Sequence, residues 1–94
     1  MSLNVTRTAI VNNPKGLHLR PAGLLAQIAA QYQAEVSITK DGLTVDARSI
    51  LDLLTLVATQ GSEVVITGTG EDAEAAVSAV AEFILSDTSE GGEG

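Results

Sequence analysis

The chain has 94 residues, a formal net charge of −7, no cysteine, and 45% hydrophobic residues that include one Phe, one Tyr and no Trp. Such a length predicts one small domain with an aliphatic core, and the lack of cysteine excludes disulfides and thiolate metal sites. The acidic balance disfavours nucleic acids and anionic membranes as partners, because basic residues supply most of the affinity for both.

Two further observations narrow the class of protein. No apolar run approaches the roughly 20 residues of a membrane span and no secretory signal opens the sequence, so we expect a cytoplasmic protein without membrane insertion. A single histidine, His18, excludes the usual multi-histidine metal sites. We therefore expect neither a metal ion nor a cofactor.

The N-terminal third of the chain predicts a strand, a turn and a helix. Residues 4–11 are rich in β-branched side chains and predict a strand, and residues 12–16 form a turn cluster that contains Pro and Gly. Residues 19–32 predict an amphipathic helix, because apolar side chains recur on one helical face. The members of that face are Leu25, Ile28, Ala29 and Tyr32.

The next segment predicts a β-hairpin. Residues 35–40 alternate between polar and apolar side chains, as a half-buried strand does. Asp41 and Gly42 are typical of a two-residue hairpin turn. Residues 43–47 then form the returning strand.

Residues 49–58 predict a short helix with two apolar stripes. The first stripe is Leu53, Leu56 and Val57, and the second is Ile50, Leu51 and Leu54. Since a short surface helix buries one face in so small a core, the second stripe is a candidate docking patch. The alternative is that the helix is sandwiched within the core and mostly buried.

The last elements complete the expected fold. Residues 63–68 predict a strand and residues 72–85 a helix whose apolar face is Ala73, Ala76, Val77, Val80, Ala81 and Ile84. The element order predicts an α+β domain at residues 1–86, with a four-stranded, mainly antiparallel sheet covered by helices on one face. Residues 87–94 are acidic and glycine-rich, and we expect them to be disordered.

His18 is the candidate reactive residue. It lies at the start of the first predicted helix, in residues 16–22 (GLHLRPA). Imidazole titrates near neutral pH, and a helix N-terminus attracts anions such as phosphate through its N–H groups and partial positive charge. Arg20 places a forked, permanently charged donor two residues further on. The combination predicts a histidine that carries a phosphoryl group.

A plainer interpretation of the same residues is also available. A lone histidine near a helix start often caps the helix or lies on the surface, and Pro21 suits a first helical turn for structural reasons alone. Capping, however, does not require an arginine. The presence of Arg20 therefore favours the phosphate interpretation.

The motif at residues 16–22, together with residues 48–51 (RSIL), resembles the histidine-containing phosphocarrier (HPr) family of the phosphoenolpyruvate-dependent phosphotransferase system. The resemblance extends over residues 4–86 and implies an open-faced β-sandwich with three helices. It also implies that Enzyme I transfers phosphate from phosphoenolpyruvate to Nδ1 of His18, in a cradle formed by the N–H groups of Leu19 and Arg20. An enzyme IIA-type protein then accepts the phosphoryl group. The chain itself is expected to be a monomer without independent turnover.

Ser49 resembles the regulatory serine that an ATP-dependent HPr kinase phosphorylates in many members of the family. Residues 49–52 also have the spacing of a helix cap, and serine is a preferred N-cap residue without any regulation. A phosphate there suits the start of a helix but lies within the candidate docking patch. Both roles of Ser49 remain open from the sequence.

The chain departs from the family pattern at the candidate docking surface of Leu19, Ile50, Leu51 and Leu54. Leu19 stands where the family has a small residue, and Asp52 stands where a small residue is common. The positive charge frequent on this surface is missing, so electrostatic steering toward an acidic Enzyme I is expected to be weaker. Residues 53–56 (LLTL) resemble the regulatory, nitrogen-type branch of the family, and the choice between that branch and the sugar-uptake branch stays open from the sequence.

Three functions remain in competition. The first is a phosphocarrier, for sugar uptake or for a regulatory phosphorelay. The second is a regulatory module that docks partners through Ile50, Leu51 and Leu54 without relaying phosphate. An independent enzyme is disfavoured, because no second acid–base residue accompanies His18.

Overall fold

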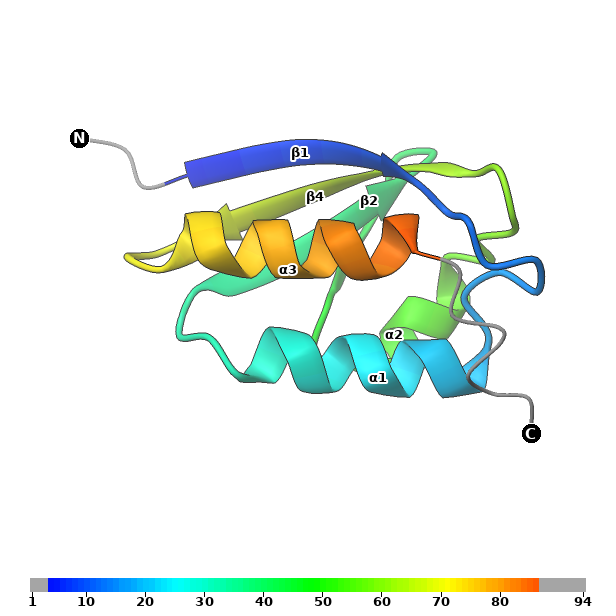
Figure 1. The fold of residues 1–94 in the computed structure, drawn as a ribbon, viewed down its shortest axis with the longest axis horizontal. Helices are drawn as coiled ribbons and strands as arrows, with labels where there is room; N and C mark the ends of the chain where they lie inside the picture. The colour runs from blue at the N-terminus through cyan, green and yellow to red at the C-terminus, as the bar shows by residue number, and fades with distance from the viewer. Residues whose placement is uncertain (1–3, 87–94) are drawn as a thin grey trace.

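The computed structural model describes residues 4–86, which form a four-stranded antiparallel sheet and three helices (Figure 1). The strand order is β1-β4-β2-β3. The elements in chain order are β1 Asn4–Ile10, α1 Leu19–Ala30, β2 Glu35–Lys40, β3 Leu43–Asp46, α2 Ile50–Thr55, β4 Glu63–Thr69 and α3 Ala73–Leu85. This architecture confirms the predicted α+β fold, and every strand pair is antiparallel. The predicted tail at residues 87–94 lies outside the described residues.

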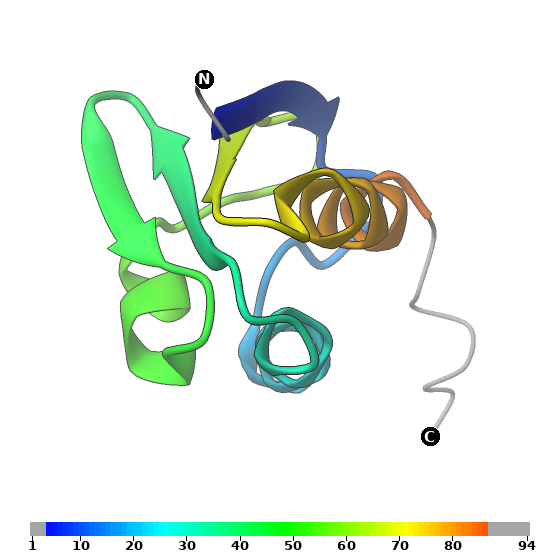
Figure 2. The same cartoon turned by 90° about the vertical axis from the view of Figure 1, so that its left-hand side faces the viewer.

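The helices all lie on one side of the sheet, as the end-on view in Figure 2 shows. The core forms between the two layers, where β4 contributes Val64 and Ile66 and β2 contributes Val36 and Ile38, all at most 2% exposed. The alternate residues of these strands face away from the helices, because successive side chains of a strand point to opposite faces. The other face of the sheet is therefore open, as in an open-faced sandwich.

The hairpin and α3 follow the sequence prediction closely. Asp41 and Gly42 have φ angles of 51° and 84°, which is the pairing that a two-residue type I′ hairpin turn requires. The six residues predicted to form the apolar face of α3 are all buried. In both elements local pattern and tertiary packing agree, so the prediction needed no long-range information.

The second helix is shorter than predicted. It ends at Thr55 with Leu56 as its C-cap, and Val57 follows in the left-handed conformation with φ of 51°. Leu53 and Leu56 are buried as expected, but the prediction that Val57 shares their core stripe is wrong, because its side chain is 70% exposed. Because the left-handed conformation of Val57 breaks the helical repeat, Val57 does not lie on the same helical face as Leu53 and Leu56. That conformation costs a β-branched residue about 1–2 kcal/mol.

Hydrogen bonds to two other segments hold the connection between β1 and α1. Val11 is paired with the loop before β4, since its N–H donates to the Ser62 carbonyl and its own carbonyl accepts from Gly61, both at 2.9 Å. The Asn12 N–H donates to the carbonyl of Ile84, near the end of α3, at 3.2 Å. The connection is therefore held to the body of the domain before it reaches α1.

The carboxylate of Asp72 holds the other end of α1. It accepts the N–H groups of Gln33 at 2.9 Å and Ala34 at 2.7 Å, in the segment between α1 and β2. The Gln33 N–H is the main cause that lowers the pKa of Asp72 below its ordinary value of 3.8; partial burial opposes it, and the N–H groups of Ala34 and of Asp72 itself add to it. The Ala34 carbonyl also accepts from Arg48 Nη2 at 3.2 Å.

We predict that Asp72→Ala lowers the Tm at pH 7, because two backbone N–H groups lose their acceptor. A carboxyl group with a depressed pKa in the folded state stabilises the fold above its unfolded pKa and loses that effect as the pH falls through the folded value. The difference in Tm between parent and variant should therefore shrink below about pH 4. Thermal unfolding followed by circular dichroism from pH 7 to pH 2 measures both effects. The exposed neighbour Glu71→Ala is the control, and an equal Tm for parent and Asp72→Ala at pH 7 contradicts the prediction.

A second prediction concerns the turn before α1. Gly16 has φ of 73°, and a Cβ on it would lie 2.4 Å from the backbone carbonyl oxygen of Ala58. Gly42 also has a positive φ, of 84°, but nothing lies within 4 Å of its Cβ position. Gly42→Ala therefore reports the conformational penalty alone, about 1 kcal/mol after the loss of unfolded-state entropy is counted.

Gly16→Ala should cost about 1–3 kcal/mol more than Gly42→Ala, because a backbone carbonyl has to move as well. Urea unfolding of the two variants and the parent gives both differences. An equal loss of unfolding free energy in the two variants would contradict the prediction, because it would show that the backbone around Gly16 shifts to accept a Cβ at no additional cost.

Candidate functional site

His18 lies at the point where the fixed β1–α1 connection enters α1. It is the N-cap residue, with an extended backbone at φ −89° and ψ −168°, and its side chain is exposed. Within the described chain, its imidazole makes no capping hydrogen bond to the first turn of α1. The residue thus occupies a capping position without acting as a side-chain cap, which leaves the ring accessible for chemistry.

The backbone of α1 presents donors beside this ring. The first N–H groups of a helix point out of its end, and Pro21 has no N–H, so those of Leu19 and Arg20 lie next to His18. The first turn of α1 contains no acidic residue, and the helix has 12 residues, enough for an N-terminal partial positive charge. Arg20 is exposed in the same turn. The three predicted site residues are therefore together, in a place suited to an anion.

Asn13 holds the turn that leads to His18. The sequence analysis assigned it only to a turn cluster. Among residues 4–86, it is the one polar residue in the buried class, at 5% exposure. Its side-chain Oδ1 accepts the Lys15 N–H at 2.9 Å and its carbonyl accepts the Gly16 N–H at 2.8 Å. Such an Asx turn is typical of asparagine before proline, which is the signal that the sequence offered.

The candidate docking residues lie across the junction of α1 and α2. Leu19 and Gly23 are four residues apart and share a face of α1, and the Cδ1 atom of Ile50 lies 3.8 Å from the Cβ position of Gly23. Leu19 is 65% exposed, Leu51 75% and Ile50 38%. Leu54 is half-buried and packs partly against the core. Three of the four predicted docking residues therefore present apolar surface, and Leu54 contributes less.

Ser49 caps α2 as its spacing predicts. Its Oγ accepts the N–H of Asp52 at 3.2 Å, and the residue is half-buried. Arg48, its neighbour in the sequence motif, is directed to the α1–β2 segment through its bond to the Ala34 carbonyl. Ser49 therefore serves as the N-cap of α2.

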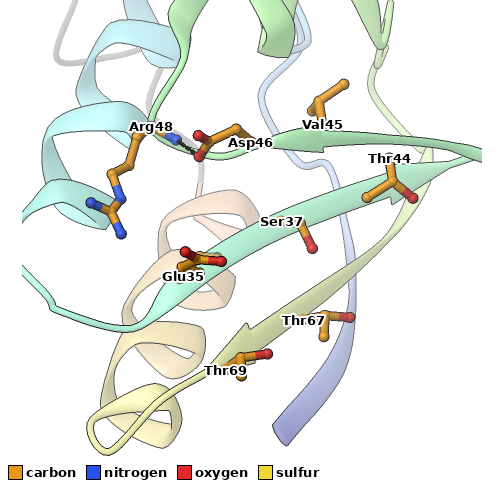
Figure 3. A pocket seen from close by; sticks show the side chains of 9 residues that line it. Glu35, Ser37, Thr44, Val45, Asp46, Arg48, Thr67 and Thr69 are labelled. Carbon is orange, nitrogen blue, oxygen red and sulfur yellow. Dashed lines mark hydrogen bonds between the residues drawn. The ribbon is translucent and has the colours of Figure 1, made fainter.

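A shallow hollow of about 500 Å³ lies elsewhere, over β2, β3 and β4. Figure 3 shows hydroxyl side chains on its floor, with Glu35, Asp46 and Arg48 around them. The residues that line it are Glu35, Val36, Ser37, Thr44, Val45, Asp46, Arg48, Thr67 and Thr69. None of the sequence-predicted site residues lines this hollow. This hollow is therefore separate from the candidate site at His18.

No helix among the described residues is long and apolar enough to cross a membrane. The same part of the chain holds no cluster of three or more His, Asp or Glu side chains arranged to bind a metal ion.

Comparison with known proteins agrees with this geometry. The family described as "PTS HPr component phosphorylation site" matches residues 5–86. The phosphocarrier protein HPr of Borreliella burgdorferi is 39% identical over 82 residues, which cover 87% of this chain and 95% of that protein.

Solved structures give the same result. The crystal structure of the phosphocarrier protein HPr from Bacillus anthracis has a TM-score of 0.84 and 40% identity, covering 86% of this chain and 96% of that one. The Bacillus subtilis catabolite repression protein Crh, described as an intertwined dimer with a swapped domain, has a TM-score of 0.73 and 34% identity, covering 88% and 95% of the two chains. The chain belongs to the HPr phosphocarrier family of the phosphotransferase system.

Proposed function

We propose that this protein accepts a phosphoryl group on His18 from Enzyme I, with phosphoenolpyruvate as its source, and passes it to an enzyme IIA-type acceptor. The observation that carries the proposal is the exposed imidazole of His18 beside the N–H groups of Leu19 and Arg20. Family membership supports the general phosphocarrier role. The domain at residues 1–86 carries this function.

The transfer step depends on positioning and charge. The Nδ1 lone pair of His18 attacks phosphorus, the new N–P bond forms, and the bond from phosphorus to the donor atom breaks. Phosphoryl transfer leaves charge on the equatorial phosphate oxygens, which hydrogen-bond donors and cations stabilise. The N–H groups of Leu19 and Arg20 and the Arg20 guanidinium fill that role. In the second transfer, an atom of the acceptor attacks phosphorus and forms the new bond, while the N–P bond to His18 breaks and Nδ1 regains its lone pair.

Partners reach His18 across the exposed docking residues Leu19, Ile50 and Leu51. We expect the protein to act as a monomer in solution. Size-exclusion chromatography with light scattering distinguishes that state from a dimer such as the one described for Crh.

The central prediction concerns His18 itself. Incubation with phosphoenolpyruvate and Enzyme I should add one acid-labile phosphate, mapped to His18 by peptide mass spectrometry. His18→Ala should abolish the modification, because no other residue of the chain carries an imidazole. Arg20→Gln should slow transfer by about 10-fold to 1000-fold, through loss of transition-state charge stabilisation.

Two outcomes contradict the proposal. A phosphate on the His18→Ala variant places the reaction elsewhere, and no modification with either a sugar-type or a regulatory-type Enzyme I removes the carrier role. Matching circular dichroism spectra for parent and variants establish that the fold is retained.

The second candidate function is a docking module that does not relay phosphate. The large exposed side chains of Leu19 and Leu51 favour it, because they offer apolar surface that a partner can bury. Binding to a partner that persists in His18→Ala, together with no phosphate on the parent protein, distinguishes this function from the carrier.

We further propose Ser49 as a regulatory phosphorylation site for HPr kinase. Its Oγ already faces the first turn of α2, so a negative charge there is compatible with the helix but lies beside the apolar docking residues. Ser49→Asp keeps a side chain that caps helices and adds the charge. We predict that it raises the KM of Enzyme I for this protein about threefold to tenfold, with little change in Tm.

Ser49→Thr is the matched control, because it keeps the capping hydroxyl without the charge. Steady-state phosphorylation assays with both variants measure the effect of charge separately from that of the cap. A KM for Ser49→Asp equal to that of Ser49→Thr contradicts the prediction.

A further inference from the structure

The charges of this chain are divided along the sequence. Residues 1–34 contain no Asp or Glu and carry three of the five basic residues. Two of these, Lys15 and Arg20, flank His18. Residues 87–94 carry three acidic residues and no basic one, and they follow the last residue that matches the family. This acidic segment therefore lies outside the family domain.

The acidic segment begins beside the candidate site. It follows Ser86, which comes directly after the end of α3. The Ile84 carbonyl in the last turn of α3 accepts the N–H of Asn12 at 3.2 Å, in the connection that leads to His18. The end of α3 and the start of α1 accordingly lie on the same side of the domain (Figure 1).

The acidic side chains can span the distance to His18. His18 lies six residues after Asn12, so the two Cα atoms are at most about 22 Å apart. An extended chain covers at most about 3.6 Å per residue, so Glu90 reaches about 20 Å from Ile84 and Glu93 about 30 Å. A carboxylate therefore reaches the first turn of α1 without any change in the described fold. Such a short tether holds its carboxylates at an effective concentration in the millimolar range.

We propose that residues 87–94 bind back onto the first turn of α1 and compete there with the phosphoryl donor of His18. That turn contains no acidic residue, and a helix N-terminus attracts carboxylates as it attracts phosphate. The exposed residues Lys15 and Arg20 add positive charge, which complements the acidic segment. The competition rests on the proposed carrier function, whereas the contact itself does not depend on it.

A spin label measures the contact without any partner protein. The chain has no cysteine, so Gly92→Cys provides a single attachment site. We expect the label to broaden the amide resonances of Leu19 and Arg20 in NMR spectra at low salt. A neutral-segment variant carries the substitutions Asp87→Asn, Glu90→Gln and Glu93→Gln.

The neutral-segment variant should show at least about twofold less broadening, although its tether is unchanged, because the ion pairs are lost. Raising the NaCl concentration to about 1 M should have the same effect on the parent sequence, since the Debye length falls to about 3 Å.

Phosphorylation by Enzyme I measures the competition. We expect its KM for the neutral-segment variant to fall about twofold to fivefold at low salt, the size expected of exposed ion pairs, with little change in kcat. The matched control removes three exposed acidic side chains at the other end of the domain, near the start of α3, with the substitutions Glu35→Gln, Glu71→Gln and Glu74→Gln. Both variants have the same net charge, so a difference between them reports the place of the charge.

Each result decides the inference. Less broadening together with a lower KM in the neutral-segment variant supports it. Equal broadening with and without the acidic side chains overturns the contact, and an equal KM for the neutral-segment variant and the charge control overturns the competition. If the parent protein takes no phosphate from Enzyme I, the proposed function fails, whereas the contact is still decided by the broadening.

Discussion

The hydrogen bond from the Leu17 N–H to the Ala58 carbonyl joins the two segments on which the candidate site is built. Leu17 directly precedes His18 and α1, and Ala58 lies in the segment that follows α2, the helix that carries the exposed Leu51. Gly16 has no room for a side chain because the same carbonyl oxygen lies against it. The bond therefore joins the entry of α1 to the segment after α2, on the side of the domain where His18 and the candidate docking residues lie.

The first helix is held at both ends, and this explains how a small aliphatic domain keeps a precise site. At its C-terminal end, Asp72 accepts two N–H groups of the following segment, and Arg48 donates to the Ala34 carbonyl of the same segment. At its N-terminal end, Asn12 is bonded to the last turn of α3. Phosphoryl transfer depends on positioning more than on acid–base chemistry. Hydrogen bonds at the helix ends are directional, so they fix the position of α1 more precisely than aliphatic packing alone does.

The sequence was sufficient for the elements in which local and tertiary preferences agree. The hairpin at Asp41 and Gly42 and the buried face of α3 are of this kind, and so is the place of His18 at a helix start. The end of α2 was not predictable, because Leu56 and Val57 continue an apolar helical period that the structure breaks with a left-handed residue. Asn13 was found only as a turn residue, since its burial depends on segments distant in the sequence.

The character of the exposed site suggests how such a carrier recognises its partners. Lys15 and Arg20 lie near His18, but the docking residues are leucine and isoleucine, and Asp52 lies among them. Charge complementarity mainly raises association rates, whereas apolar contacts act mainly through dissociation rates. A carrier must release its donor before it meets its acceptor, so the contact cannot be extensive. A few large exposed side chains around His18, as proposed for docking, suit both requirements, because a small apolar contact can select a partner and still release it.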